Sequence, residues 1–307
     1  MQQFDKLTED NETIERLIEL IPGWSGKSYS WEPITGGITN RNYKIVIDNK
    51  ANFVSIAGNH LKTLGVDFTD KCFNNRVCAN LGLSPKILHF AKSERVLVSE
   101  FLPYPAFTQR SLQKTTNLHQ LLNTLKKLHS GPDFRNEFDM FKLIVRYMQV
   151  VDTKSISLPP DHPDILGLAR TIGASLAPFR THLVPCHNDL IPSNILSDGK
   201  QIFLIDFDYS GQNDPCFELG NLCVEAGYNA FQTRELLYTY FGQVSDNSLS
   251  RTCLHGMLSD IGWSLWSFIQ SHISTIDFDF KSYGLHRWKN AGRKIKNGEC
   301  RKWLNSL

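Results

Sequence analysis

Two acidic residues and one amide residue, closely spaced past the middle of the chain, have the types that metal-assisted phosphoryl transfer needs. They are Asp189, Asn194 five residues later, and Asp206 twelve residues after that. An aspartate can accept the proton of an attacking hydroxyl, and amide and carboxylate oxygens suit Mg²⁺ held against the phosphates of a nucleotide. The pattern predicts Asp189 as general base and Asn194 and Asp206 as metal ligands. The alternative is a surface loop of solvated polar side chains, and the spacing alone does not exclude it.

The segment that follows Asn194 has the pattern of a β-hairpin. Two short apolar runs, 195–196 and 202–205, are separated by the turn-forming residues Ser197-Asp198-Gly199-Lys200. Asn194 then stands at the start of one strand and Asp206 at the end of the other. Because paired strands bring such positions together, the hairpin favours the phosphotransferase interpretation over the solvated loop.

Two neighbouring features of the sequence have simpler interpretations. His187 more often braces a loop of this type by hydrogen bonds, and no second His or Cys stands near it at ligand spacing, so we expect no zinc site. Gly36-Gly37 lies between two strand-like runs, where glycines let backbone N–H groups approach phosphate oxygens and Thr39 and Asn40 add donors. A plain hairpin turn explains most Gly-Gly pairs.

The composition is that of an ordinary globular protein. The 307 residues are 41% hydrophobic and 21% charged, with a net charge of +2, which gives no argument for a nucleic-acid or membrane surface. Seven scattered cysteines, with no C-x-x-C pair, predict reduced thiols in a cytoplasmic protein. We see no secretory signal and no apolar run long enough to span a bilayer, so we expect no membrane insertion.

The order of the predicted elements indicates an α+β fold in two domains. We expect a β-rich domain over 1–102 and a larger, mainly helical domain over 103–307, with Pro103 and Pro105 marking the hinge between them. The first domain is predicted to have helices at 8–21 and 70–81 and a strand, a glycine turn and a strand over 31–47, followed by strands at 53–57, 87–90 and 96–101. In the second, helices are expected at 117–129, 138–151 and 165–179, and most of the chain after 217 is helical.

Several segments together resemble one known family, the choline/ethanolamine kinases, whose kinase-like fold is shared with aminoglycoside phosphotransferases. The resemblance spans about residues 33 to 290. The part that points to choline kinases is Trp263-Ser264-Leu265-Trp266-Ser267-Phe268-Ile269-Gln270. The other matching segments are Gly36 to Asn40, His187 to Asp189 with Asn194, Ile205 to Tyr209, Phe217 to Glu225 and, weakly, Asp277 to Tyr283.

The resemblance implies a bilobal protein-kinase-like fold and an ATP- and Mg²⁺-dependent kinase in phospholipid metabolism, with a small amino alcohol as substrate and a homodimer left open. It places Asp208 at an acidic position near the metals, and Trp263, Trp266 and Tyr283 around the choline headgroup. A quaternary ammonium is best held by aromatic faces with carboxylates nearby, for which Glu225 and Glu218 are candidates. Without the resemblance, the two tryptophans would be assigned to the core, and Glu218 fits a helix start better than a substrate contact.

The chain departs from the family pattern at two positions. Kinases of this fold usually carry a basic residue on the strand after the glycine turn, paired with a Glu on the next helix. Here Ser55 stands at the first position and Lys71 at the second. Three interpretations stay open: Lys71 reaches the phosphates from the helix, Lys62 or Arg41 substitutes, or nucleotide handling is impaired.

The sequence therefore predicts a kinase that phosphorylates choline or a related amino alcohol. One alternative is a kinase of another small alcohol, such as thiamine or an aminoglycoside. Another is a pseudokinase that binds an amino alcohol without phosphorylating it, for which Ser55 and Lys71 are the support.

Overall fold

The computed structural model describes every residue except Met1, Gly36 and Ile38, and it describes residues 2–8 by their backbone alone. The chain divides into two compact units. The smaller comprises residues 1–58 and 86–102, and the larger comprises residues 59–85 and 103–307.

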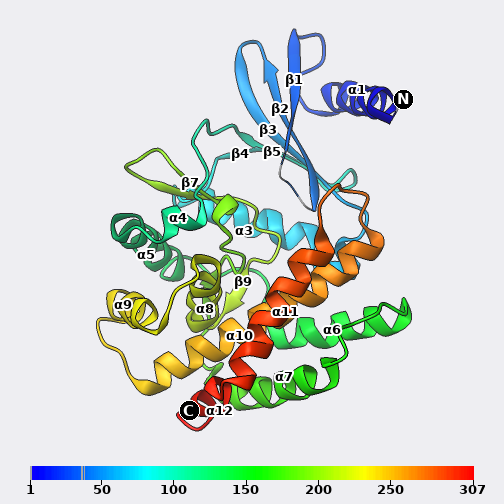
Figure 1. The fold of residues 1–307 in the computed structure, drawn as a ribbon. Helices are drawn as coiled ribbons and strands as arrows, with labels where there is room; N and C mark the ends of the chain where they lie inside the picture. The colour runs from blue at the N-terminus through cyan, green and yellow to red at the C-terminus, as the bar shows by residue number, and fades with distance from the viewer. Residues whose placement is uncertain (1, 36, 38) are drawn as a thin grey trace. The chain divides into compact units, whose positions relative to one another are not determined.

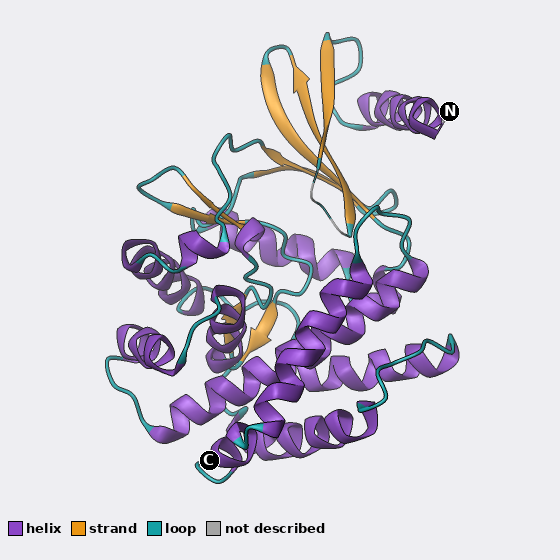
Figure 2. Cartoon of the chain, viewed as in Figure 1, coloured by secondary structure: helices purple, strands orange, loops and turns teal. Residues whose placement is uncertain are grey.

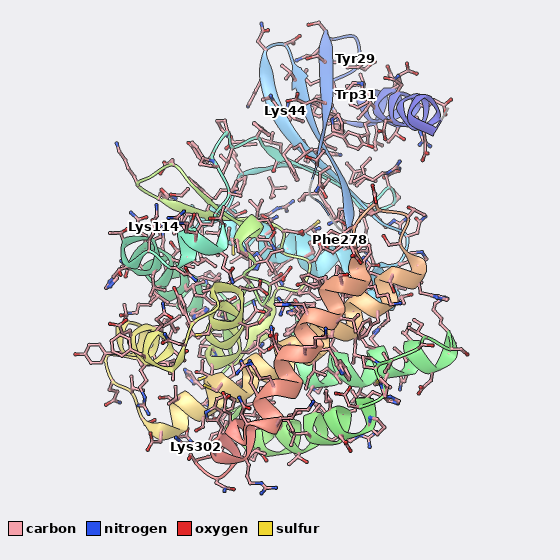
Figure 3. The ribbon with its side chains drawn as sticks, in the orientation of Figure 1. Tyr29, Trp31, Lys44, Lys114, Phe278 and Lys302 are labelled. Carbon is pink, nitrogen blue, oxygen red and sulfur yellow. The ribbon has the colours of Figure 1, made fainter. Side chains whose placement is uncertain are left out.

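The small unit is an antiparallel sheet of five strands in the order β1-β2-β3-β5-β4, with one helix. Apolar residues of the helix, among them Ile14 and Leu17, pack against the buried face of the sheet. Trp31 and Lys44 lie on neighbouring strands (Figure 3), where Trp31 packs edge-on against Tyr43 and Lys44 stacks on Phe101. The elements are α1 (Gln2–Leu20), β1 (Tyr29–Ile34), β2 (Asn40–Ile47), β3 (Lys50–Ala57), β4 (Ile87–Ala91) and β5 (Val96–Glu100).

Residues 59–85 group with the large unit, whereas the sequence analysis assigned them to the first domain. The reason is a set of contacts made by α3 and the turn after it. Leu204 N donates to Leu83 O at 2.8 Å, Asn74 Nδ2 donates to Ser210 Oγ at 3.0 Å, and Cys78 and Leu83 belong to the core of the large unit. The small unit ends at residue 102.

The large unit is mostly helical, with four short strands (Figure 2). These elements confirm the α+β class and the helical character of the chain after residue 217. The helices are α2 (Leu61–Leu64), α3 (Phe68–Asn80), α4 (Gln109–Leu112), α5 (Thr115–His129), α6 (Met140–Thr153), α7 (His162–Leu176), α8 (Pro215–Ala226), α9 (Ala230–Phe241), α10 (Asp246–Ile273), α11 (Phe280–Lys296) and α12 (Glu299–Leu304), and the strands are β6 (Val184–Cys186), β7 (Ile195–Ser197), β8 (Ile202–Leu204) and β9 (Gly211–Asn213).

The core of the large unit fixes the hairpin formed by β7 and β8. The leucine face predicted for α5 is buried, with Leu121 and Leu125 fully enclosed, and it belongs to the same apolar cluster as Ile195 and Leu204 of the hairpin. Buried apolar area of this kind stabilises by roughly 25 cal/mol per Å². The two ends of the hairpin are thereby held against a rigid helix.

Helix α10 is the centre of the large unit, and α8 and α11 lie alongside it (Figure 1). Two glycines allow this close packing. A Cβ on Gly220 of α8 would lie 2.4 Å from the carbonyl oxygen of Thr252 on α10, and one on Gly284 of α11 would lie 2.9 Å from the ring of Phe268. Only glycine fits at such approaches, and the result is that side chains of three helices meet at one place.

Asp214 caps α8 and holds it to α10. Its carboxylate accepts from Cys216 N at 2.9 Å, and its Oδ2 lies 2.5 Å from Arg251 Nη2 and 3.5 Å from His255 Nε2. Burial alone would raise the pKa of Asp214, but the neighbouring His255 and Arg251 outweigh it and hold that pKa well below its usual range.

Replacing Asp214 with asparagine is expected to lower the free energy of unfolding at pH 7 by about 3 kcal/mol, because a buried ion pair loses one partner. The pKa of this group is lower in the folded protein than in the unfolded chain. Its contribution is therefore complete above the unfolded pKa and is lost as the pH falls through the acid range. Urea unfolding at pH 7 and near pH 3 should show a difference between wild type and variant that shrinks at the lower pH. The exposed Asp246→Asn should change little at either pH, and an Asp214→Asn difference independent of pH would contradict the assignment.

All seven cysteines are free thiols. Among the described residues, no helix is both long enough and apolar enough to cross a lipid bilayer.

Candidate active site

The loop that carries Asp189 follows β6 and is held by the backbone of the hairpin. His187 is fully buried and its Nε2 lies 2.8 Å from the carbonyl oxygen of Ile205, which is the bracing role predicted for it. Asn188 adopts a left-handed conformation with φ of 66° and its Nδ2 donates to the carbonyl oxygen of Tyr209 at 3.0 Å. These bonds turn the chain so that Asp189 follows on the half-buried side of the loop.

The structure brings Asp189, Asn194 and Asp206 together. Asn194 Nδ2 donates to the backbone oxygen of Asp189 at 3.0 Å and lies 3.3 Å from its Oδ2. Ile205 N donates to Asn194 O at 3.0 Å, which places Asp206 beside Asn194 at the end of the hairpin. The β7–β8 pairing that the sequence predicts is confirmed, with Ile195 opposite Leu204. Asp206 adopts a left-handed conformation with φ of 64°, as Asn188 does.

Burial controls the protonation of the two acids. It raises the pKa of Asp189 to about 7, with Arg287 lowering it and Asp208 raising it further. For Asp206, burial and the neighbouring Asp208 raise the pKa above its ordinary value, and Lys71 opposes them. Two carboxylates kept close together in this way attract a cation.

The donor set at the end of the hairpin fits a Mg²⁺ ion. Asn194 uses its amide nitrogen on Asp189, which leaves its Oδ1 oxygen for a cation. Asp206 pairs with Lys71 through Oδ1, which leaves Oδ2. An amide oxygen and a carboxylate oxygen are hard ligands of the kind that Mg²⁺ prefers.

Lys71 of α3 inserts its ammonium group between the two acids of the hairpin end. It forms an ion pair with Asp208 Oδ1 and lies 3.6 Å from Asp206 Oδ1. Its side chain is only 3% exposed and that of Asp208 only 4%. Burial disfavours the charged lysine, but Asp208 and Asp206 more than offset this and raise its pKa above the ordinary value, so the ammonium stays protonated.

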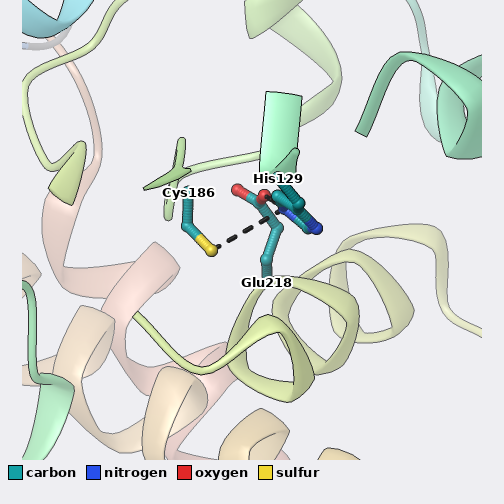
Figure 4. A group of neighbouring side chains, drawn as sticks. All are labelled: His129, Cys186 and Glu218. Carbon is teal, nitrogen blue, oxygen red and sulfur yellow. Dashed lines mark hydrogen bonds and ion pairs between the residues drawn. The ribbon is translucent and has the colours of Figure 1, made fainter. Parts of the chain in front are cut away.

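Behind the catalytic loop, three buried side chains form a cluster (Figure 4). Glu218 Oε1 accepts from Asn188 N at 2.8 Å, and its Oε2 lies 2.5 Å from Nε2 of His129. Cys186 Sγ lies 3.7 Å from the same nitrogen, and His129 Nδ1 lies 2.5 Å from the hydroxyl of Tyr240. The cluster has the ligand types of a zinc site, yet the nitrogen and both carboxylate oxygens already bind each other or Asn188.

This cluster explains Glu218, which lies in the first turn of α8 and is completely buried. It holds the backbone next to Asp189 and does not face a substrate. The sequence indicates ligands only where they are close to His187 in the chain, so it gives no sign that His129 lies beside Cys186.

Trp263 and Trp266 share one face of α10, as their spacing predicts, and both are 4% exposed. The Trp263 ring packs edge-on against Tyr209 at 4.7 Å and its Nε1 donates to Asn221 Oδ1 at 3.2 Å. Trp266 packs against Phe280 at 5.7 Å, and its Nε1 is buried without a hydrogen-bond partner among the described residues. The two rings belong to an aromatic wall.

Tyr283 of α11 continues this aromatic wall. Phe278, labelled in Figure 3, is 39% exposed and its ring centroid lies 5.9 Å from that of Tyr283. Burial, followed by the nearby Asp189, raises the pKa of the Tyr283 hydroxyl above its usual range. Tyr283 therefore lies within electrostatic reach of the candidate base.

Arg287 lies one helical turn after Tyr283 and connects α11 to acids of two other helices. Its Nε donates to the Tyr283 hydroxyl at 2.8 Å and its guanidinium stacks on the same ring at 5.2 Å. It forms an ion pair with Glu225 of α8 and lies 3.5 Å from Asp260 of α10. Burial lowers the pKa of Arg287 to about 10, and Asp189 opposes that shift. Glu225 thus has a cation partner within the protein.

Arg287 and Asp260 are residues that the sequence analysis did not single out. Both had a signal in the spacing of helix positions, since Arg287 follows Tyr283 by four residues and Asp260 precedes Trp263 by three. A charged residue on the same helix face as a candidate aromatic cage is a reasonable site candidate.

The candidate phosphate-binding residues belong to the small unit. Gly36 lies outside the described residues. A Cβ on Gly37 would lie 2.7 Å from Asn42 Nδ2, so the chain has no room for a side chain there. Thr39 is half-buried and Asn40 is buried at the start of β2. Ser55 lies on β3, opposite Asn42, and is also buried.

Comparison with known proteins agrees with the kinase interpretation of the site. The family model for choline/ethanolamine kinase matches residues 31–241, more than half of the chain. Protein LicA of Haemophilus influenzae is 25% identical over 272 residues, which cover 85% of this chain and 78% of LicA. Ethanolamine kinase 2 of Homo sapiens is 25% identical over 312 residues, which cover 92% of this chain and 80% of that protein.

Solved structures confirm the predicted protein-kinase-like fold. A choline/ethanolamine kinase family protein from Mesorhizobium loti superimposes with a TM-score of 0.81 at 25% identity, over 96% of this chain and 98% of that one. A structure of LicA in complex with AMP gives a TM-score of 0.75 at 23% identity, over 92% and 96% of the two chains.

Proposed function

Because the chain belongs to the choline/ethanolamine kinase family, we propose that it transfers the γ-phosphoryl group of ATP to the hydroxyl of choline or a closely related amino alcohol. Membership of the family makes it a phosphotransferase with an alcohol acceptor, and the amino alcohol used is the proposal. The observation that supports it most is the closeness of an aromatic wall to a candidate base: the Trp263 ring packs against Tyr209 at 4.7 Å, and the carbonyl oxygen of Tyr209 accepts from Asn188, the residue before Asp189.

In this proposal the residues of the site divide the work of binding and catalysis. Asp189 accepts the proton of the substrate hydroxyl, and Asn194 fixes the Asp189 loop by its hydrogen bonds. Trp263, Trp266 and Tyr283 present ring faces to the quaternary ammonium of choline, which has no N–H group to donate a hydrogen bond. The reacting hydroxyl is then held beside the base, and the entropy of bringing the two together is lost on binding.

Glu225 contributes less charge to the ammonium than a free carboxylate, because Arg287 pairs with it. The aromatic faces therefore provide most of the recognition, and Glu225 with Arg287 fixes the position of α8 against α11. In the small unit, Gly37, Thr39 and Asn40 would supply donors to the phosphates of ATP. When bound by Asn194 and Asp206, Mg²⁺ would neutralise charge that develops on the transferred group.

The test is transfer of radiolabelled γ-phosphate to a panel of choline, ethanolamine, thiamine and an aminoglycoside. We expect phosphorylated choline or ethanolamine and no product from the other two. The absence of transfer to every amino alcohol would overturn the proposal. The cytoplasmic location and a homodimer stay predictions, for which cell fractionation and sedimentation are the measurements.

One observation favours a second candidate function, an amino-alcohol sensor without kinase activity. Ser55 lacks the charge that kinases of this fold place on that strand, and Lys71 is engaged by the acids Asp206 and Asp208. Thermal shifts distinguish the two functions. Stabilisation by choline together with none from Mg²⁺-ATP would support the sensor, whereas stabilisation by both would support the kinase.

Replacing Trp266 with leucine is expected to raise the KM for choline about 30-fold with little change in kcat, because a desolvated cation–π contact contributes about 2 kcal/mol. The substitution breaks no side-chain hydrogen bond, since the Trp266 Nε1 has no hydrogen-bond partner among the described residues. Steady-state kinetics at saturating ATP measure the effect.

Phe268→Leu is the matched control, because Phe268 lies two residues later on the same helix and packs against Trp288. It should lower stability and leave the KM unchanged. Equal changes in KM from the two variants would indicate that Trp266 is a core residue and not part of a cage.

A further inference from the structure

Lys71 is an unusual residue to find at a magnesium site. Lysine is almost never fully buried unless it is paired, and here the side chain is 3% exposed and its ammonium contacts Asp208 and Asp206. By the family resemblance, its position on α3 corresponds to the one where kinases of this fold carry an acid. The reversal of charge at this position brings a permanent cation to the acids of the metal site.

The position of this cation is fixed within one unit of the protein. Residues 59–85, which include Lys71, group with the large unit that carries Asp206 and Asp208. The ion pair therefore does not depend on the placement of the small unit. Ser55, in contrast, belongs to the small unit and has no charge to compete for these acids.

Kinases with this arrangement of acids and amide usually hold two Mg²⁺ ions against the nucleotide. We propose that Lys71 replaces one of them, so that this chain binds its nucleotide with a single divalent ion. The inference rests on the proposed function. Asp208, which is paired with Lys71, no longer serves as a metal ligand, and the remaining ion is held by Asn194 and Asp206.

A second Mg²⁺ at Asp208 is disfavoured by charge. It would lie within a few ångströms of the Lys71 ammonium in a water-poor site, where like charges repel strongly. Release of Lys71 toward the phosphates is also disfavoured, because it would leave the buried Asp208 carboxylate without its ion-pair partner. The Lys71 ammonium, with a compact charge and three donors, pairs with Asp208 and with only one oxygen of Asp206, so that the other Asp206 oxygen stays with the single metal ion.

The experiment counts metal ions directly. Mn²⁺ is titrated into the protein in the presence of a saturating non-hydrolysable ATP analogue, and bound Mn²⁺ is measured by electron paramagnetic resonance. We expect one Mn²⁺ per protein–nucleotide complex for the wild type and two for Lys71→Gln, which removes the ammonium group from Asp208. Lys142→Gln, a change of an exposed lysine on α6, should keep one.

Two Mn²⁺ ions in the wild type would overturn the inference and leave the proposed function intact. One Mn²⁺ in both the wild type and a folded Lys71→Gln would also overturn it. If Lys71→Gln does not fold, Lys71→Arg keeps the charge and should again bind one ion, so that the wild-type count remains decisive. A wild type that binds no nucleotide at any Mn²⁺ concentration would overturn the proposed function and this inference with it.

Discussion

Replacing Asp189 with asparagine is expected to lower kcat by about 10³-fold, within the range that a positioned general base contributes. The amide has the shape of the carboxylate and keeps an oxygen for Asn194 Nδ2, which lies 3.3 Å from Asp189 Oδ2. The loop should therefore keep its conformation while losing the group that accepts the proton. Steady-state kinetics with choline and ATP, together with thermal denaturation, measure the two effects separately.

The control for Asp189 is Asp152→Asn, an equal change at an exposed position on α6. It should leave kcat and stability as in the wild type. A kcat for Asp189→Asn within tenfold of the wild type, in a protein of unchanged stability, would show that Asp189 is not the base.

Replacing Asp206 with alanine is expected to lower kcat/KM for ATP by about 10³-fold, because loss of a metal ligand removes several kcal/mol of charge stabilisation in the transition state. The Mg²⁺ concentration for half-maximal activity should rise at the same time. Lys71 keeps its ion pair with Asp208 in this variant, and thermal denaturation measures separately the strain that alanine meets at a φ of 64°. Activity measured over a range of free Mg²⁺ tests both expectations.

Asp198→Ala is the matched control for Asp206. Asp198 lies in the turn between β7 and β8, where its carboxylate accepts from Lys200 N and Gln201 N at the exposed end of the hairpin. Its replacement should leave the Mg²⁺ dependence as it is. A normal Mg²⁺ dependence in Asp206→Ala would remove this residue from the metal site.

The hairpin shows why part of the site could be predicted from the sequence. Its turn is determined by local chemistry, with Asp198 bonding to the backbone and Gly199 at a φ of 89°. The apolar runs on both sides are adjacent in the chain, and their pairing fixes where Asn194 and Asp206 lie. The leucine face of α5 is similarly local, because periodicity alone identifies it.

The charge partners of the site could not be predicted in this way. Lys71 meets Asp208, Arg287 meets Glu225, and His129 meets Glu218 only because elements distant in the chain pack together. Residues 59–85 were expected in the first domain and group with the large unit for the same reason, since α3 packs on the hairpin core. Local pattern determines single elements, while the ionic network depends on tertiary packing.

The backbone at Asn188 has a consequence for how this chain can change over time. A φ of 66° is a conformation that β-branched and bulky residues rarely adopt, and that glycine, asparagine and aspartate tolerate. Glycine would lose the side-chain hydrogen bond to the carbonyl oxygen of Tyr209, and aspartate would place a second acceptor beside that oxygen. Few substitutions at Asn188 are therefore tolerated, although it is the neighbouring Asp189 that we propose as the general base.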